Sequence, residues 1–146
     1  MDQEPLKYSD TYEQDHSRIA ASPVGSRIAI HDGDFLRDPI PDSHDVAILA
    51  NIIHGHSPEQ NLSLFRAVRH NMPPAGRLLI VDFWMDPTHT DPLFGALMAG
   101  EFLVNTSNGD VYSYDEGENW LPQTGWQKVN RLPLAGPLSL LVGQAT

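Results

Sequence analysis

Two long apolar runs stand out in the pattern of hydrophobic and polar positions along the chain. Residues 46–53 read Val-Ala-Ile-Leu-Ala-Asn-Ile-Ile, and residues 78–84 read Leu-Leu-Ile-Val-Asp-Phe-Trp. Runs without regular polar alternation are typical of strands that are covered on both faces, as in parallel sheets. We therefore expect both runs to be neighbouring strands at the centre of a mostly parallel sheet.

The segment between the two runs carries the signals of one helix. Residues 57–60, Ser-Pro-Glu-Gln, supply an N-cap, a proline at the first helical position and a capping-box glutamine. Four apolar side chains then share one helical face: Leu64, Phe65, Val68 and Met72. Pro73 is expected to end the helix. A strand, a helix and a second strand in this order predict a right-handed βαβ unit.

The rest of the chain divides into a polar amino-terminal segment and several further elements. Residues 1–25 are expected to hold one short helix that ends near residue 21, and the alternation over residues 26–31 predicts a strand. Helices are expected over residues 91–104 and 115–124, and an antiparallel hairpin over residues 126–132 and 138–143. The predicted fold class is α/β, with a mostly parallel sheet that ends in an antiparallel β-hairpin.

Composition and charge narrow the classes of function. The 146 residues make one domain, and the formal net charge of −10 argues against binding to a phosphate backbone, which needs clustered lysine and arginine. The absence of cysteine excludes disulfides, thiolate nucleophiles and cysteine-based zinc sites. No apolar run has the length of a membrane span and no signal-like segment occurs, so we expect a cytoplasmic protein without nucleic-acid or membrane partners.

Three ionisable residues follow the predicted strands, namely Asp34, His54 and Asp82. In an open α/β sheet, the carboxyl ends of the parallel strands face the ligand crevice, so these side chains are expected to converge on one rim. A single histidine at a strand end is more often structural than catalytic. An aspartate on the neighbouring strand changes this balance, because it can hold the imidazole tautomer in which the other ring nitrogen accepts a proton.

The histidines also allow a metal-site interpretation. His54 and His56 flank Gly55, and His70 and His89 follow later in the chain. No set of these histidines with a carboxylate has the spacing of a zinc site, and the His-Gly-His sequence lies in a predicted turn. We therefore expect no metal.

Four segments occur in an order that resembles a known family. They are RIAIHDGDFLRDPIP at 27–41, ILANIIHGHSPEQ at 48–60, PPAGRLLIVD at 73–82 and YSYDEGENWLPQTGW at 112–126. Together they are similar to the carboxyl-terminal half of S-adenosylmethionine-dependent O-methyltransferases of the caffeic-acid and hydroxyindole type, including bacterial enzymes that modify small molecules. The resemblance runs from about residue 27 to residue 143. It implies that residues 26–146 are the carboxyl-terminal part of a catalytic domain with an incomplete class I, Rossmann-like sheet.

The resemblance also assigns roles to individual residues. It implies that His54 is the catalytic base and that Asp82 orients it, where the family has a histidine and a glutamate. The candidate cofactor contacts are Asp34, Phe35 and Asn51, and the candidate contacts to the methyl acceptor are Trp84, Met98 and Phe102.

Several positions depart from the family's pattern. The family's His-Asp-Trp is His54-Gly55-His56 here, and Val111 stands where plant members carry a second glutamate, next to Asp110. The glycine-rich turn G-x-G-x-G, which approaches the methionine part of the cofactor, is absent from this sequence, as are the first two strands of the family's sheet. We expect self-association or a partner chain to complete the sheet, because residues 46–53 are too apolar for an open edge.

The resemblance implies a reaction as well. S-adenosylmethionine would donate a methyl group to a hydroxyl of a small, aromatic acceptor, and the histidine would take the hydroxyl proton without help from a metal. Two alternatives remain open at this stage. The chain could be a non-catalytic fragment or subunit of a split methyltransferase, or it could use the same scaffold for a different reaction.

Overall fold

A computed structural model describes the backbone of residues 8–146 and the side chains from residue 14 onward. The chain divides into two compact units, residues 1–34 and residues 35–146, which we describe separately. The described part of the first unit holds helix α1 (Tyr8–Ala20) and a short 3-10 turn, η1 (Gly25–Arg27). The predicted amino-terminal helix is thus present.

The strand predicted over residues 26–31 is wrong. Residues 25–27 form the 3-10 turn instead, and the amide of Ile28 donates to the carbonyl of Gly25 inside that turn. The alternation of Ile28 and Ile30 indicated one buried face, but the side chain of Ile28 is 45% exposed. A strand needs the backbone groups of a neighbouring strand, and none of the described residues supplies them to this segment.

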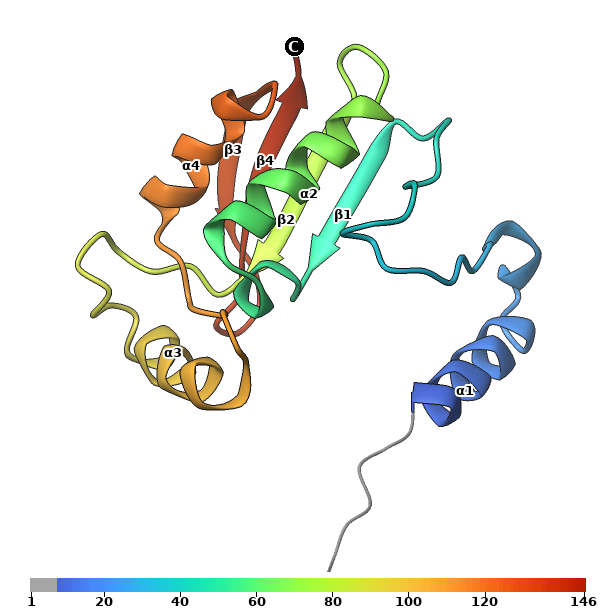
Figure 1. Cartoon of the computed structure of the whole chain (residues 1–146), viewed down its shortest axis with the longest axis horizontal. Helices are drawn as coiled ribbons and strands as arrows, with labels where there is room; N and C mark the ends of the chain where they lie inside the picture. Colours follow the sequence, from blue (N-terminus) through green and yellow to red (C-terminus); the bar gives the residue numbers. More distant parts are fainter. Residues whose placement is uncertain (1–7) are drawn as a thin grey trace, which may run out of the picture. The chain divides into compact units, whose positions relative to one another are not determined.

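The second unit is an α/β structure built on one open sheet of four strands (Figure 1). The strands are β1 (Val46–Ala50), β2 (Arg77–Asp82), β3 (Trp126–Pro133) and β4 (Ser139–Ala145), in the spatial order β1-β2-β4-β3. Strands β1 and β2 are parallel, and β4 is antiparallel to both β2 and β3. Three of the four strands therefore run in one direction. The predicted α/β fold, the parallel neighbours and the carboxyl-terminal hairpin at one edge are confirmed.

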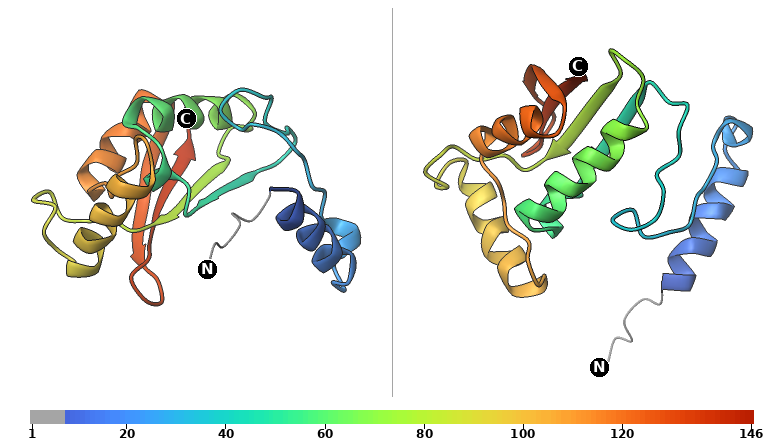
Figure 2. Two further views of the ribbon diagram at one scale, coloured as in Figure 1. Left: turned by 60° about the horizontal axis from the view of Figure 1, so that its bottom comes forward. Right: turned by 45° about the horizontal axis from the view of Figure 1, so that its top comes forward.

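Two helices cover one face of this sheet (Figures 1 and 2). Helix α2 (Pro58–His70) begins with the predicted capping box, in which Ser57 and Gln60 exchange side-chain and backbone hydrogen bonds. Helix α4 (Tyr114–Gln123) begins with the same device, made by Ser113 and Glu116. Each box satisfies amide groups that would otherwise lack partners in the first helical turn. Helix α3 (Leu93–Asn105) lies beside the carboxyl end of β2 in the same views.

The hydrophobic core lies between these two helices and the sheet. Its fully buried side chains come from α2, β2, α4, β3 and β4: Leu64, Phe65, Leu78, Ile80, Leu121, Trp126 and Leu141. The indole Nε1 of Trp126 donates to the carbonyl of Phe65 at 3.1 Å, which ties the hairpin to α2. Strand β2 contributes Leu78 and Ile80 to this core, and it carries one of the two candidate catalytic residues.

Strand β1 differs from the prediction in length and in burial. It ends at Ala50, because Asn51 adopts a positive φ of 55° and the chain then turns into a second 3-10 turn, η2 (Ile53–Gly55). The side chain of Ile53 is buried from that turn and not from the strand. Strand β1 is also not covered on both faces, since the side chain of Ile48 is 62% exposed. In addition, no described strand pairs with the outer edge of β1.

Strand β2 is shorter than the predicted run of residues 78–84, because it ends at Asp82.

Among the described residues, no helix has both the length and the apolar character needed to cross a membrane.

Two glycines in helices offer a matched test of the packing. A Cβ at Gly117 in α4 would lie 2.4 Å from the ring of Trp84, whereas a Cβ at Gly100 in α3 meets nothing within 4 Å. We expect Gly117→Ala to lower the free energy of unfolding by about 1–3 kcal/mol, since overpacking outweighs the gain in helix propensity. Gly100→Ala should instead raise it by roughly 0.5–1 kcal/mol. Urea unfolding of both variants measures the difference, and equal stabilities would contradict the packing of Trp84 against α4.

Candidate active site

His54 and Asp82 meet where two neighbouring parallel strands end. The register pairs Ala50 with Val81, and the amide of Asn51 donates to the carbonyl of Val81 at 2.9 Å, so β1 and β2 stop at the same level. Turn η2 then brings His54 over the end of β2, where Asp82 is the last residue. His54 Nδ1 lies 2.7 Å from Asp82 Oδ1.

Burial and hydrogen bonds fix the carboxylate of Asp82 in place. The residue is fully buried, and its Oδ1 also accepts a hydrogen bond from the amide of Phe83 at 2.8 Å. A proton on Nδ1 of His54 completes this arrangement, because a carboxylate can only accept. The other ring nitrogen, Nε2, is then an acceptor, and 16% of the His54 side chain remains exposed. In this tautomer, Nε2 is the nitrogen from which a neutral His54 can take a proton.

The backbone around His54 is held by residues far away in the sequence. The carbonyl of His54 accepts from the amide of Asp110 at 3.0 Å. Gly109 is needed beside it, because a Cβ at that position would lie 2.2 Å from the same carbonyl oxygen. The side chain of Asn61, fully buried in α2, donates to the carbonyl of Ile53 at 2.9 Å. The turn that carries His54 is thus clamped between α2 and the segment before α4.

Tyr112 supplies a second clamp on this turn. Its hydroxyl donates to the carbonyl of His56 at 2.5 Å. Burial raises the pKa of the Tyr112 hydroxyl well above its ordinary value, and the nearby carboxylates of Asp110, Glu116 and Glu59 raise it further. The hydroxyl consequently stays protonated and remains a donor to the turn throughout the physiological pH range.

Aromatic rings surround the imidazole of His54. The ring of Phe102, from α3, stacks on it with centroids 4.0 Å apart and an interplanar angle of 5°. The ring of Phe83 approaches both at a tilt, with centroids 5.8 Å from His54 and 6.2 Å from Phe102. Phe94 in α3 contacts Phe83 in turn, at 5.7 Å. This cluster gives the open side of the histidine an apolar, aromatic border.

The other predicted site residues lie in different surroundings. Phe35 is 42% exposed and meets the ring of His56 edge-on, with centroids 5.4 Å apart. Asn51 is exposed at the end of β1, and Met98 is half-buried in α3. Trp84 is buried in the core, where it stacks on Tyr114 rather than on the rings around His54. Asp34 belongs to the first unit, which is described by itself.

Five residues that sequence analysis did not single out contribute to the site, and two of them, Gly109 and Tyr112, are described above. Phe83 and Phe94 complete the aromatic cluster, and nothing in their local sequence separates them from ordinary core residues. Asn61 had a recognisable signal, because it is a polar residue on the same helical face as Leu64 and Phe65.

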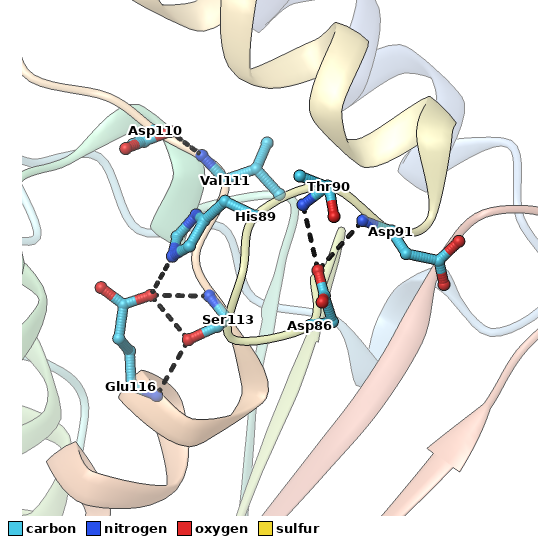
Figure 3. Close-up of polar contacts among 8 residues, drawn as sticks. All are labelled: Asp86, His89, Thr90, Asp91, Asp110, Val111, Ser113 and Glu116. Atoms are coloured by element: carbon cyan, nitrogen blue, oxygen red, sulfur yellow. Dashed lines mark hydrogen bonds and ion pairs between the residues drawn. The ribbon is translucent and has the colours of Figure 1, made fainter.

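The loop after β2 is tied down by polar contacts, which Figure 3 shows. The carboxylate of Asp86 accepts from the amides of Thr90 and Asp91, both at 3.0 Å. Its hydrogen bonds, first of all one from the Thr88 hydroxyl, lower the pKa of Asp86 to about 2. His89 Nε2 lies 3.2 Å from Glu116 Oε2, on the glutamate that also caps α4 (Figure 3).

No metal centre is formed by these groups. His89 pairs with a single carboxylate, and His54 pairs with another. In the part of the chain that the structure describes, no three histidine, aspartate or glutamate side chains gather in a way that could hold a metal ion.

Comparisons with known proteins give this geometry a family. The chain is 32% identical to a 3-hydroxy-5-methyl-1-naphthoate 3-O-methyltransferase from Streptomyces sahachiroi, over 82% of this chain and 34% of that protein. It is 30% identical to a phenazine O-methyltransferase from Lysobacter antibioticus, over 85% of this chain and 36% of that protein. The chain thus spans about a third of the length of these relatives.

A solved structure agrees with the sequence relatives. An O-methyltransferase family 2 protein from Planctomyces limnophilus, solved with apigenin, superposes with a TM-score of 0.86 at 26% identity, over 92% of this chain and 40% of that one. The model of the O-methyltransferase domain family matches residues 12–127. The chain therefore belongs to the O-methyltransferase domain family.

Proposed function

We propose that this chain provides the catalytic-base side of an S-adenosylmethionine-dependent methyltransferase that acts on a hydroxyl of a small aromatic molecule. The observation that carries this proposal is the 2.7 Å contact between His54 Nδ1 and Asp82 Oδ1 at the ends of adjacent parallel strands. It supplies a base in a fixed tautomer at the edge of the sheet where ligands bind in open α/β folds.

The proposed chemistry assigns one task to each of these residues. A hydroxyl is a weak nucleophile while it is protonated, and Nε2 of His54 takes this proton as the oxygen attacks. Asp82 keeps Nδ1 protonated and stabilises the imidazolium that forms, with its own position held by the amide of Phe83. General-base catalysis of this kind contributes roughly 10²–10⁴-fold to a rate. The cofactor, when bound, supplies the electrophilic methyl group.

The proposed acceptor is planar and aromatic. Phe102 and Phe83 border the imidazole, and half-buried Met98 lies on the same helix as Phe102. Such a border favours flat rings through dispersion and stacking. The relatives named for a naphthoate and a phenazine act on molecules of this class.

The residues present fit only part of the cofactor. Exposed Phe35 next to His56 and exposed Asn51 are the proposed contacts on the adenine side. Asp34 is proposed as a cofactor contact from the sequence resemblance alone. The sequence contains no glycine-rich turn of the kind that lets backbone amides reach the other end of such a cofactor. These residues do not form a complete cofactor site by themselves, so we assign them no step of the transfer.

We propose that further strands, from a partner chain or from a second copy, complete the sheet along β1. The outer edge of β1 is not paired with any described strand, and Val46 and Ile48, which share one face of this strand, are 43% and 62% exposed. An apolar edge of this kind favours the addition of another strand.

A second candidate reaction has one observation in its favour. The chain is also 25% identical to an L-tyrosine C(3)-methyltransferase from Streptomyces lavendulae, over 83% of this chain. The same base can remove the hydroxyl proton of a phenol; the phenolate then attacks the methyl group through its ortho carbon, and loss of the proton from that carbon restores the aromatic ring. The remaining alternative is a non-catalytic subunit of a split methyltransferase, in which the His54–Asp82 pair would be structural.

The cofactor prediction concerns the chain by itself. We expect weak or no binding of S-adenosylmethionine, because the wall for the methionine end is missing. Calorimetric titration measures this directly. Submicromolar affinity for the purified chain would contradict the proposal that another chain completes the site.

The catalytic prediction concerns His54 in the assembly that turns over. His54→Ala should lower kcat by roughly 10²-fold or more and leave cofactor affinity nearly unchanged, because base catalysis acts only in the transition state. Asp82→Asn should lower kcat by a smaller factor than His54→Ala does. Transfer of labelled methyl groups to a panel of hydroxynaphthoates and other phenols is the measurement.

His70→Ala is the matched control for this experiment, since His70 is an exposed histidine in the last turn of α2, at the other end of the sheet from His54 and Asp82. It should retain kcat within a few-fold. Parental turnover by His54→Ala would refute the assignment and favour a structural role for the pair.

A further inference from the structure

We propose that Phe102 is a positioning residue that holds the imidazole plane of His54, and that it thereby restricts the methyl acceptor to flat molecules. This inference rests on the proposed function of His54 as the base. The two rings are nearly parallel, with an angle of 5° between their planes and 4.0 Å between their centroids.

The hydrogen bond to Asp82 does not by itself fix this plane. It anchors the imidazole at one atom, Nδ1, and the ring can still rock about that contact. A second ring laid flat on the imidazole face removes the rocking motion, because any tilt pushes atoms of the two rings together. The ring of Phe83 meets the imidazole at an angle of 42°, so it restricts the tilt of the imidazole less than Phe102 does. Asp82 therefore fixes the tautomer, and Phe102 fixes the plane.

The fixed plane has a consequence for the acceptor. The lone pair of Nε2 lies in the plane of the imidazole, so the hydroxyl that it deprotonates must approach within that plane. The O–H bond of a phenol lies in the plane of its own ring. A flat phenol can thus lie coplanar with His54 while its face continues along the aromatic side chains of α3. A saturated alcohol of similar size gains no stacking from this alignment.

The position of Phe102 in α3 suits this role. Its carbonyl accepts from both the amide and the hydroxyl of Thr106, each at 2.8 Å, which pins the last turn of the helix. At the other end of α3, a Cβ at Gly95 would lie 3.0 Å from the side chain of Met85, so the helix packs closely against the chain that follows β2. Phe102 is itself only half-buried, so its ring is not a major part of the core.

The test compares Phe102→Leu with Phe102→Tyr in the full chain. The leucine keeps an apolar side chain without a ring, and the tyrosine keeps the ring. Nitrogen NMR of His54 should show the Nδ1–H proton exchanging about tenfold faster in Phe102→Leu, because the ring can rock, while the intact Asp82 keeps the same tautomer. The tyrosine variant should restore the parental exchange rate. A Phe102→Leu spectrum identical to that of the parent would overturn the proposal.

The second arm measures turnover in the active assembly. Phe102→Leu should lower kcat by about tenfold for flat phenols, with the KM for the cofactor unchanged, and should reduce the preference for flat over saturated acceptors. Val104→Ala is the matched control, because Val104 lies two residues from Phe102 on the same helix and is 81% exposed. If Phe102→Leu and Val104→Ala behave alike, Phe102 has no positioning role.

The two arms separate this inference from the proposed function. Absence of methyl transfer by every assembly of the parent chain would refute the function, and the NMR comparison would still decide whether Phe102 holds the ring. Normal methyl transfer together with an unchanged His54 spectrum in Phe102→Leu would refute only the positioning role.

Discussion

The parallel pairing of β1 with β2 determines the site, because it brings the ends of two strands to the same level. Ala50 pairs with Val81, and the amide of Asn51 extends the ladder by one more hydrogen bond. From that point, one turn places His54 above Asp82. A shift of the register by one residue would turn Asp82 to the opposite face of the sheet and break the 2.7 Å contact. The capped helix α2 protects the register, since it joins the two strands and packs on both.

The same pairing explains what this part of the fold leaves open. Strand β2 is buried between β1 and β4, whereas β1 has one neighbour and carries exposed Val46 and Ile48. Helix α3 is also unusually apolar for its exposure, with Leu93, Leu97 and Leu103 each at least 65% exposed. Helix α3 borders the proposed site through Phe102, whereas Val46 lies at the opposite end of β1 from His54.

The sequence predicted the elements whose signals are local. The capping box at Ser57 and the two apolar runs were sufficient to predict the βαβ unit. The positions of His54 and Asp82 after two neighbouring strands were sufficient to predict that their side chains meet. Prediction failed where long-range contacts decide the structure. Residues 26–31 have a strand pattern but no described neighbour to pair with. Residues 51–53 leave the strand at the positive φ of Asn51, and the turn that follows is held by Asn61 and the amide of Asp110. The stack of Phe102 on His54 joins residues 48 positions apart, and no local pattern encodes it.

The state of the Asp82 carboxylate bears on whether the pair is functional. Its Oδ1 accepts two hydrogen bonds, but its buried Oδ2 has no partner among the described residues. Leaving a buried acceptor without a partner costs about 1–3 kcal/mol, and an apolar residue at the end of β2 would avoid this loss. The two hydrogen bonds that Oδ1 accepts offset part of this cost. The proposed role gives a further reason for an aspartate here, since a carboxylate oxygen accepts the Nδ1 proton of His54 and so sets the tautomer.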